Sequence, residues 1–275
     1  MSLLRMGGAF CLSVFFMLAC NTASAQSQLI LAISEGTSGG LEHGQVIAKY
    51  QDLANTLGIA LKTKVSVVFA REFATLENGM KEGKFDFVMA RPSDYPARGM
   101  RDNGYQFVAS ARPDGQCLVI VPKDSAIRSL ADARGKRFVM PEQVSYMSRF
   151  CRAELRDRGI DLGKENVQYV REQAAVPFYM KNNFADVGAI ASYSGPARKL
   201  DADGFRVLHT SVSQPYFPLV AHARFKPEQL KAIQRELESL ADRPGGPELL
   251  KRVGIAGFDT GSEARMKELL AWLEK

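Results

Sequence analysis

Residues 117–141, CLVIVPKDSAIRSLADARGKRFVMP, contain the pattern from which the architecture can be inferred. The first apolar run ends at Pro122 and is too short for a helix, so it predicts a buried strand. Polar residues follow, and a short helical turn then ends at Gly135. A second apolar run ends at Pro141. We therefore expect this segment to fold as strand, turn, short helix and strand.

The same alternation continues on both sides of that segment. Further strands are expected at residues 29–33, 65–70, 85–90, 107–110, 167–170, 184–191, 205–208 and 217–221. Longer helices are expected at about residues 42–57, 147–158, 227–241 and 262–272, with Ser145 and Ser262 as N-caps. Residues 113–115, Pro-Asp-Gly, predict a turn between two strands. Strands that alternate with helices favour an α/β fold with mostly parallel sheets covered on both faces.

The first 25 residues have the regions of an export signal. Arg5 provides the positive charge, an apolar run follows, and residues 23–25, Ala-Ser-Ala, form a small-residue cleavage motif. We expect residues 1–25 to be removed as a signal peptide and the protein to be periplasmic. The alternative, which the sequence favours less, is a lipid-anchored form acylated at Cys20, because Met17 stands where such sites usually have leucine.

The charge and the motif content narrow the class of partner. The 275-residue chain has a formal net charge of +6, which falls by one when Arg5 leaves with the signal. This modest basic excess suits either an acidic ligand or a solvated surface. No lysine-rich block or zinc-finger spacing supports a nucleic-acid partner. We expect a monomer that uses no cofactor and no metal ion.

Cleavage of the signal would leave two cysteines, Cys117 and Cys151. In an oxidising compartment an even pair can form a disulfide. Equally, both can be small buried hydrophobic residues, one in a strand and the other in a helix. The two alternatives stay open because the sequence does not give the distance between the residues.

Three arginines follow predicted strands: Arg71, Arg91 and Arg171. In open α/β sheets the ligand lies beyond the carboxyl ends of the strands, so these side chains are expected to face one cleft. Guanidinium groups match the oxygens of carboxylates and phosphates, which makes an anionic ligand the natural inference. Each arginine taken singly could instead be a solvated loop residue, because most charged side chains stay exposed.

At residues 123–137, KDSAIRSLADARGKR, the chain resembles the type II periplasmic substrate-binding proteins of ABC importers, and within them the phosphate/phosphonate-binding branch. Residues 83–95, GKFDFVMARPSDY, and 182–194, NNFADVGAIASYS, are similar to two further segments of that family. The resemblance implies two lobes, each a mostly parallel sheet flanked by helices, joined by two crossing hinge segments. Residues 26–115 with 212–275 are expected to form lobe 1, and residues 116–211 lobe 2.

The resemblance is incomplete in the loops that would hold the ligand. The relatives have a run of Ser and Thr at one helix start, where this chain keeps only Ser145. Their ligand-facing histidine is matched by Gln173, and Phe73 stands where they often have tyrosine. A site for a phosphoryl group would thus leave several oxygens unpaired, at about 1–3 kcal/mol each. This argues against a site for simple alkylphosphonates.

These observations favour a periplasmic solute receptor that closes on a small anionic ligand of the phosphate or phosphonate kind and delivers it to an ABC permease. The alternatives are a ligand-sensing partner of a membrane sensor and a receptor for a different solute. No enzyme is expected, since the chain lacks a nucleophile elbow, a phosphate-binding P-loop and metal-spaced His or Cys. The predicted ligand-binding residues are Arg71, Arg91, Ser93, Ser145, Tyr146, Arg171 and Gln173, Tyr95 from the resemblance, and Thr37 with Ser38.

Overall fold

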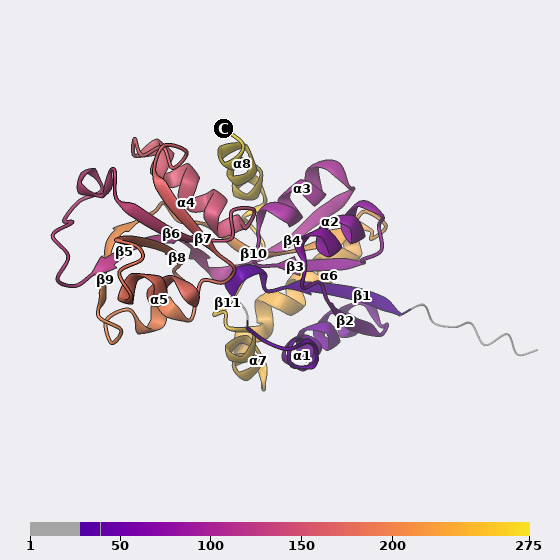
Figure 1. Cartoon of the computed structure of the whole chain (residues 1–275). Coiled ribbons are helices and arrows are strands. Elements are labelled where there is room, and N and C mark those ends of the chain that lie inside the picture. The colour runs from indigo at the N-terminus through magenta and orange to yellow at the C-terminus, as the bar shows by residue number, and fades with distance from the viewer. Residues whose placement is uncertain (1–27, 39) are drawn as a thin grey trace, which may run out of the picture.

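The computed structural model describes residues 28–38 and 40–275. Its strands form two sheets that are flanked by helices, so the chain folds into two α/β lobes (Figure 1). The predicted signal segment at residues 1–25 and the alternative acylation site at Cys20 lie outside the described residues. In the described part of the chain no helix has the length and apolar character needed to cross a membrane.

The sheet of lobe 1 has six strands in the spatial order β11-β4-β10-β3-β1-β2. Their bounds are β1 (Leu29–Ser34), β2 (Val65–Phe69), β3 (Phe87–Ala90), β4 (Tyr105–Gly115), β10 (Gln214–His222) and β11 (Gly257–Asp259). Strand β1 is parallel to β2 and β3, whereas β10 and β11 run antiparallel to their neighbours. The carboxyl ends of β1, β2 and β3 therefore meet at one edge, where α/β sheets place ligands.

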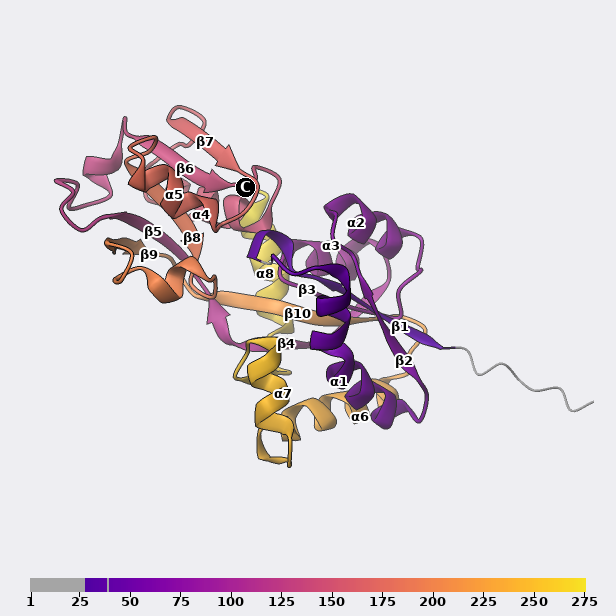
Figure 2. The same ribbon diagram turned by 60° about the horizontal axis from the view of Figure 1, so that its bottom comes forward.

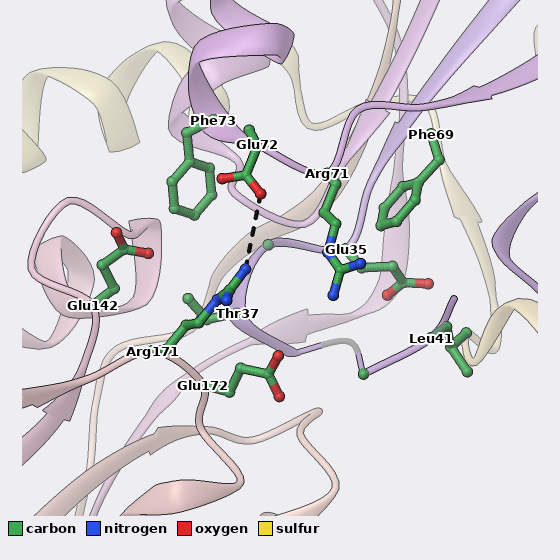
Figure 3. Close-up of a pocket in the computed structure, with 12 residues that line it drawn as sticks. Glu35, Thr37, Leu41, Phe69, Arg71, Glu72, Phe73, Glu142, Arg171 and Glu172 are labelled. Atoms are coloured by element: carbon green, nitrogen blue, oxygen red, sulfur yellow. Dashed lines mark ion pairs between the residues drawn. The ribbon is translucent and has the colours of Figure 1, made fainter. Parts of the chain in front are cut away.

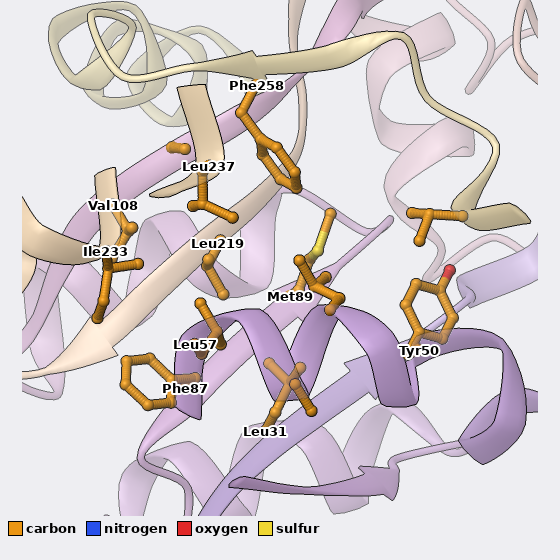
Figure 4. Close-up of a cluster of buried hydrophobic side chains, with 14 of the residues drawn as sticks. Leu31, Tyr50, Leu57, Phe87, Met89, Val108, Leu219, Ile233, Leu237 and Phe258 are labelled. Carbon is orange, nitrogen blue, oxygen red and sulfur yellow. The ribbon is translucent and has the colours of Figure 1, made fainter. Parts of the chain in front are cut away.

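Helices cover both faces of this sheet. They are α1 (His43–Leu61), α2 (Phe73–Lys81), α3 (Asp94–Asp102), α6 (Pro227–Glu238) and α7 (Gly246–Val253), with the 3-10 turns η1 (Gly36–Ser38) and η4 (Ser239–Asp242). The alternation of side chains along β1 explains the two layers. Leu31 belongs to the same buried cluster as Leu57 of α1 and Leu237 of α6 (Figure 4), and so does Ile33. Ala32, which points the other way along β1, belongs to a different cluster.

The sheet of lobe 2 has five strands in the order β7-β6-β8-β5-β9. The elements of this lobe are β5 (Cys117–Pro122), η2 (Ala131–Ala133), β6 (Arg137–Pro141), α4 (Tyr146–Asp157), β7 (Asn166–Val170), α5 (Ala175–Lys181), β8 (Val187–Ala191), η3 (Pro196–Lys199) and β9 (Phe205–Thr210). Of the two alternatives for the cysteines, the structure contains the disulfide. Cys117 of β5 is bonded to Cys151 of α4, with Cα atoms 5.4 Å apart.

The chain crosses between the sheets twice, once from β4 to β5 and once from β9 to β10 (Figure 2). The last helix, α8 (Glu263–Leu273), packs between the lobes. Its residues Met266, Leu269 and Leu270 join a hydrophobic cluster that includes Ala97 of α3 and Phe150 of α4. The apolar stripe of this helix is therefore covered by both lobes.

Three local predictions are wrong. Residues 113–115 predict a turn, but β4 continues through them because β10 and β11 pair with its second half. Helix α7 and strand β11 were not expected, since the proline- and glycine-rich residues before Gly246 resemble a loop. Ser262 stands at the N-cap position of α8, but its hydroxyl bonds the Ser110 hydroxyl at 2.6 Å and does not cap the helix.

Candidate functional site

The loops that follow β1, β2 and β3 of lobe 1 meet the loops that follow β6 and β7 of lobe 2. Two adjoining cavities lie there, and Gly36, Thr37 and Phe73 line both of them. The charged cavity has a volume of about 60 Å³, and its other charged or polar lining residues are Glu35, Arg71, Glu72, Glu142, Arg171 and Glu172. The buried cavity, of about 10 Å³, is lined among others by Arg91, Ser145, Tyr146, Gln173 and Tyr193.

Two of the three predicted arginines line the charged cavity with exposed guanidinium groups. Arg71 enters from lobe 1 together with Glu72, and Arg171 enters from lobe 2 together with Glu172 (Figure 3). The nearest ion pairs are loose, with a guanidinium nitrogen of Arg71 3.9 Å from Glu42 and one of Arg171 3.9 Å from Glu72. Exposed pairs at such distances contribute little, about 0–1 kcal/mol. Both arginines therefore remain able to bind a ligand.

The third arginine is placed differently. Arg91 is only 7 % exposed, and its Nε donates to the Glu35 carboxylate while Nη2 donates to the Val253 carbonyl at 3.2 Å. Its guanidinium also lies over the rings of Phe217 and Tyr216, 4.5 and 5.5 Å from their centroids. Arg91 thus forms part of the wall of the buried cavity, with most of its hydrogen-bonding capacity used inside the protein.

Among the cavity residues that sequence reasoning missed, Glu35 has the most contacts with its neighbours. It follows β1 directly and is buried, and it accepts hydrogen bonds from Lys49 and from the Tyr50 hydroxyl, both at 2.6 Å, as well as from Arg91. Burial alone would raise the pKa of Glu35, but Arg91 and Lys49 outweigh it and lower the pKa to about 2. The arginines were predicted because they directly follow strands, at the edge of the sheet where ligands bind. Glu35 directly follows β1, so the same reasoning would also have found it.

The start of α4 provides the lobe 2 side of the buried cavity. The predicted N-cap is confirmed, since the Ser145 hydroxyl accepts from the Ser148 amide at 3.3 Å. That hydroxyl is therefore engaged within its own helix. Tyr146 is 3 % exposed, and its hydroxyl lies beside the buried Ser93 side chain. Burial raises the pKa of Tyr146, so the group stays a neutral hydroxyl.

Gln173 connects the two lobes. Its amide nitrogen donates to the Thr37 hydroxyl at 3.4 Å, and its backbone N–H donates to the Thr37 carbonyl at 3.2 Å. The side-chain oxygen accepts from the Ala191 amide at 2.6 Å. Both ends of this buried side chain are therefore in use, and the lobes touch at this point.

Two predicted residues lie beside the site, and one falls outside the description. Ser93 is fully buried next to Tyr146, and its hydroxyl accepts from the Phe217 amide at 3.3 Å. Tyr95 stacks on Phe73 with ring centroids 5.6 Å apart, inside the core between α2 and α3. Neither is among the residues that line the two cavities. The side chain of Ser38 lies outside the described part of the chain.

A match to a known family accompanies this two-lobed geometry. Residues 41–266 match the family described as ABC transporter, phosphonate, periplasmic substrate-binding protein. The chain belongs to this family. The phosphonate-binding family consists of periplasmic solute-binding proteins of ABC transporters and is a transport class, not a class of enzymes. Membership implies a small-molecule ligand and a membrane permease as partners.

Solved structures with the same fold include phosphonate-binding proteins. Two of them are PhnD1 from Prochlorococcus marinus in complex with methylphosphonate (TM-score 0.71, 11 % identity, 89 % of this chain and 96 % of that one) and a binding protein component of an ABC phosphonate transporter from Pseudomonas aeruginosa (0.68, 16 %, 90 % and 87 %). A protein from Xanthomonas citri bound to chloride ion has the same fold (0.73, 18 %, 90 % and 97 %). At these identities the likeness shows the fold. It leaves the ligand of this family member to be argued from its own residues.

No group of three or more His, Cys, Asp or Glu that could hold a metal ion occurs among residues 28–38 and 40–275. The chemistry that the cleft offers is therefore carried by guanidinium, carboxylate, hydroxyl and amide groups. Such groups suit reversible binding of a polar solute.

Proposed function

We propose that this protein captures a small ligand bearing an oxyanion in the cleft between its lobes and delivers that ligand to an ABC permease. The observation that carries the proposal is the placement of Arg71 and Arg171. One arginine from each lobe lines the same cavity, and both guanidinium groups are exposed. An oxyanion bound by both would contact the two lobes at once and so favour the closed arrangement.

The size of the cavities supports a hinge motion. The buried cavity, at about 10 Å³, is about the space that one water molecule needs. A ligand of several non-hydrogen atoms can enter only if the lobes separate. Separation would break the contacts of Gln173 with Thr37 and of Arg171 with Glu72, which join lobe 2 to lobe 1. Ligand entry is therefore coupled to opening, as expected for a hinged receptor.

We further propose that the signal segment at residues 1–25 directs the protein to the periplasm, where it acts as a monomer. The periplasmic character of the family supports the location. The division into lobe 1 (residues 26–115 and 212–275) and lobe 2 (residues 116–211) accounts for the two crossings between the sheets.

A thermal-shift screen of residues 26–275 would test the proposal. Phosphate, phosphite, phosphonates, sulfonates, carboxylates and amines would be compared. A ligand at a hundredfold over its Kd adds about 2.7 kcal/mol to the free energy of unfolding, which is readily detected. Stabilisation by one class of oxyanion is the expected result, and a response only to solutes without an oxyanion would contradict the proposal.

Two variants connect the screen to the site. Arg71→Ala and Arg171→Ala are each expected to weaken binding of the stabilising oxyanion by about tenfold or more, because a hydrogen bond to a charged group contributes about 1.5–3 kcal/mol. Arg128→Ala is the control, since Arg128 is exposed and lines neither cavity. Unchanged affinity, by isothermal titration, in both cleft variants would show that the oxyanion binds elsewhere.

A further inference from the structure

A third cavity lies outside the cleft, where α3, α4 and α8 come together. Figure 1 shows α8 between α3 and α4, and it contacts both of them. The cavity, which we call the helix cavity, has a volume of about 450 Å³, within the range of about 300–1,000 Å³ that is typical of small-molecule sites. It shares no lining residue with the two cavities of the cleft.

Four arginines line the helix cavity, and three of them come from one helix. Arg149, Arg152 and Arg156 of α4 are spaced three and four residues apart, so they project from the same side of the helix. The fourth, Arg98, comes from α3. Like charges at these spacings repel each other. The row on α4 therefore destabilises the protein unless anions balance it.

One lining carboxylate serves two of the arginines. A single oxygen of Asp94, Oδ2, accepts from Arg98 at 3.2 Å and from Arg149 at 2.8 Å. Each guanidinium has five N–H donors, so most of the donors on these two groups have no hydrogen-bond partner among the described residues. The pair also has one positive charge more than Asp94 can balance.

The other two lining carboxylates are paired with cations outside the helix cavity. Glu274 is 2.7 Å from Arg101, and Asp161 is 3.5 Å from Lys164. Neither Arg101 nor Lys164 lines the cavity. The charges of Glu274 and Asp161 are therefore already balanced, and these residues do not neutralise the arginines.

The two remaining arginines differ in their partners. Arg156 is 2.9 Å from Asp157, which balances it. Arg152 donates to the neutral Tyr169 hydroxyl at 3.0 Å and is in no ion pair among residues 28–38 and 40–275. Two guanidinium charges around the helix cavity thus lack a carboxylate, one from the pair that shares Asp94 and one from Arg152.

Apolar side chains form the rest of the lining. Ala153 comes from α4, Leu162 from the segment that follows α4, and Leu270 and Leu273 from α8. Such a surface suits the hydrocarbon part of a small ligand. Guanidinium groups match the oxygens of phosphates and carboxylates in geometry and in charge. The helix cavity therefore combines an anion-binding side with an apolar side.

We propose that the helix cavity is a second ligand site, which binds a small organic dianion with an apolar body, such as a phosphate monoester. The dianion balances the two guanidinium charges that lack a carboxylate, and the apolar body packs on Leu270 and Leu273. Arg98 belongs to lobe 1 and Arg149 to lobe 2, so a dianion that contacts both favours the arrangement of the lobes in this structure. The site does not depend on the ligand of the cleft.

Isothermal titration with phenyl phosphate tests the proposal, and phenol and inorganic phosphate are the matched probes. The mature chain would carry Arg71→Ala/Arg171→Ala, so that these cleft arginines cannot bind the probes. Phenyl phosphate is expected to bind about tenfold or more tightly than either matched probe, because phenol lacks the charge and inorganic phosphate lacks the ring. Absence of binding, or equal affinity for phenol or for inorganic phosphate, would overturn the proposal.

Two further double substitutions in that protein assign the binding to residues. Arg152→Gln/Arg156→Gln is expected to weaken binding of phenyl phosphate by about tenfold or more. Arg128→Gln/Arg134→Gln removes the same charge from exposed residues that line none of the three cavities, and it should leave the affinity unchanged. The same affinity in these two proteins would show that phenyl phosphate binds elsewhere and would overturn the site.

The melting temperature without ligand separates a binding role from a structural one. Arg152→Gln/Arg156→Gln is expected to leave it unchanged or to raise it, because the repulsion between neighbouring guanidinium groups on α4 is relieved. A clear fall in the melting temperature would show that these arginines maintain the position of α4. That result would overturn their assignment as ligand-binding residues.

Discussion

Two buried carboxylates, Glu35 and Asp94, follow neighbouring strands of the same sheet, yet their pKa values move in opposite directions. Burial works against ionisation of Glu35, but its cationic partners outweigh burial and the pKa falls to about 2. At Asp94, in contrast, burial outweighs the nearby guanidinium groups of Arg98 and Arg149 and raises the pKa. Burial is similar at the two sites, so it does not decide the outcome.

The difference lies in how the carboxylate oxygens are used. Both oxygens of Glu35 accept hydrogen bonds, Oε1 from Lys49 and Tyr50 and Oε2 from Arg91. At Asp94 both guanidinium groups bond the same oxygen, Oδ2, and Oδ1 is buried without a partner among the described residues. Hydrogen bonds to both oxygens stabilise the charged form of a buried carboxylate. A half-satisfied carboxylate remains costly to ionise.

The two sites also differ in which lobes they join. The partners of Glu35 that are named above, Lys49, Tyr50 and Arg91, all belong to lobe 1. Asp94 is a residue of α3 in lobe 1, whereas Arg149, 2.8 Å away, belongs to α4 in lobe 2. If the lobes separate as proposed above, this contact would break.

Of the changes that test this comparison, replacing Glu35 by glutamine is expected to lower the free energy of unfolding most. The Arg91 guanidinium would remain buried without a carboxylate, and a buried charge that loses its partner costs about 3–5 kcal/mol. Urea unfolding of the mature chain would measure the loss. Glu72→Gln is the control, because its carboxylate is exposed and the change should stay within about 0.5 kcal/mol. A loss below about 1 kcal/mol for Glu35→Gln would show that Arg91 finds another partner.

The pH dependence of stability is the next largest expected effect. The ordinary pKa of Glu35 is 4.5 and the folded-state value about 2, so its contribution is fully present above pH 4.5 and is lost as the pH falls toward 2. The separation corresponds to about 3 kcal/mol. Asp94 acts in the opposite sense, since its raised pKa destabilises the fold as the pH rises above 3.8. Unfolding measured from pH 2 to 6 should therefore be flatter for Glu35→Gln than for the wild type. An identical slope in the two proteins would contradict the assignment.

Replacing Asp94 by asparagine is expected to have the smallest effect, a change of no more than about 1 kcal/mol, because it removes a charge that is costly to bury along with two hydrogen bonds. Its partners Arg98 and Arg149 are partly exposed and can be solvated after the change. The same unfolding experiment measures it, and its slope with pH should become steeper than that of the wild type. A loss as large as that of Glu35→Gln would remove the distinction between the two carboxylates.

The comparison also shows which site features follow from local sequence. Arg71 and Arg171 were expected at strand ends, and the structure brings both to one cavity. Arg91 satisfied the same rule, but it is paired with Glu35, which directly follows β1 and lies 56 residues earlier in the chain. A rule that places residues at the edge of a sheet does not tell which charges will pair there, because pairing depends on distances between neighbouring strands and on burial.

By itself the sequence determined the two α/β units, the succession of strands and helices, and the family. These properties depend on periodicity and on short segments, which are local. Tertiary structure alone decided the pairing of Cys117 with Cys151, the extension of β4 through residues 113–115 and the burial of Arg91. It also brought the carboxylates of Glu72, Glu142 and Glu172 to the same cavity as the arginines of the cleft. Each of these depends on contacts between segments that are distant in the chain, and no local pattern encodes such contacts.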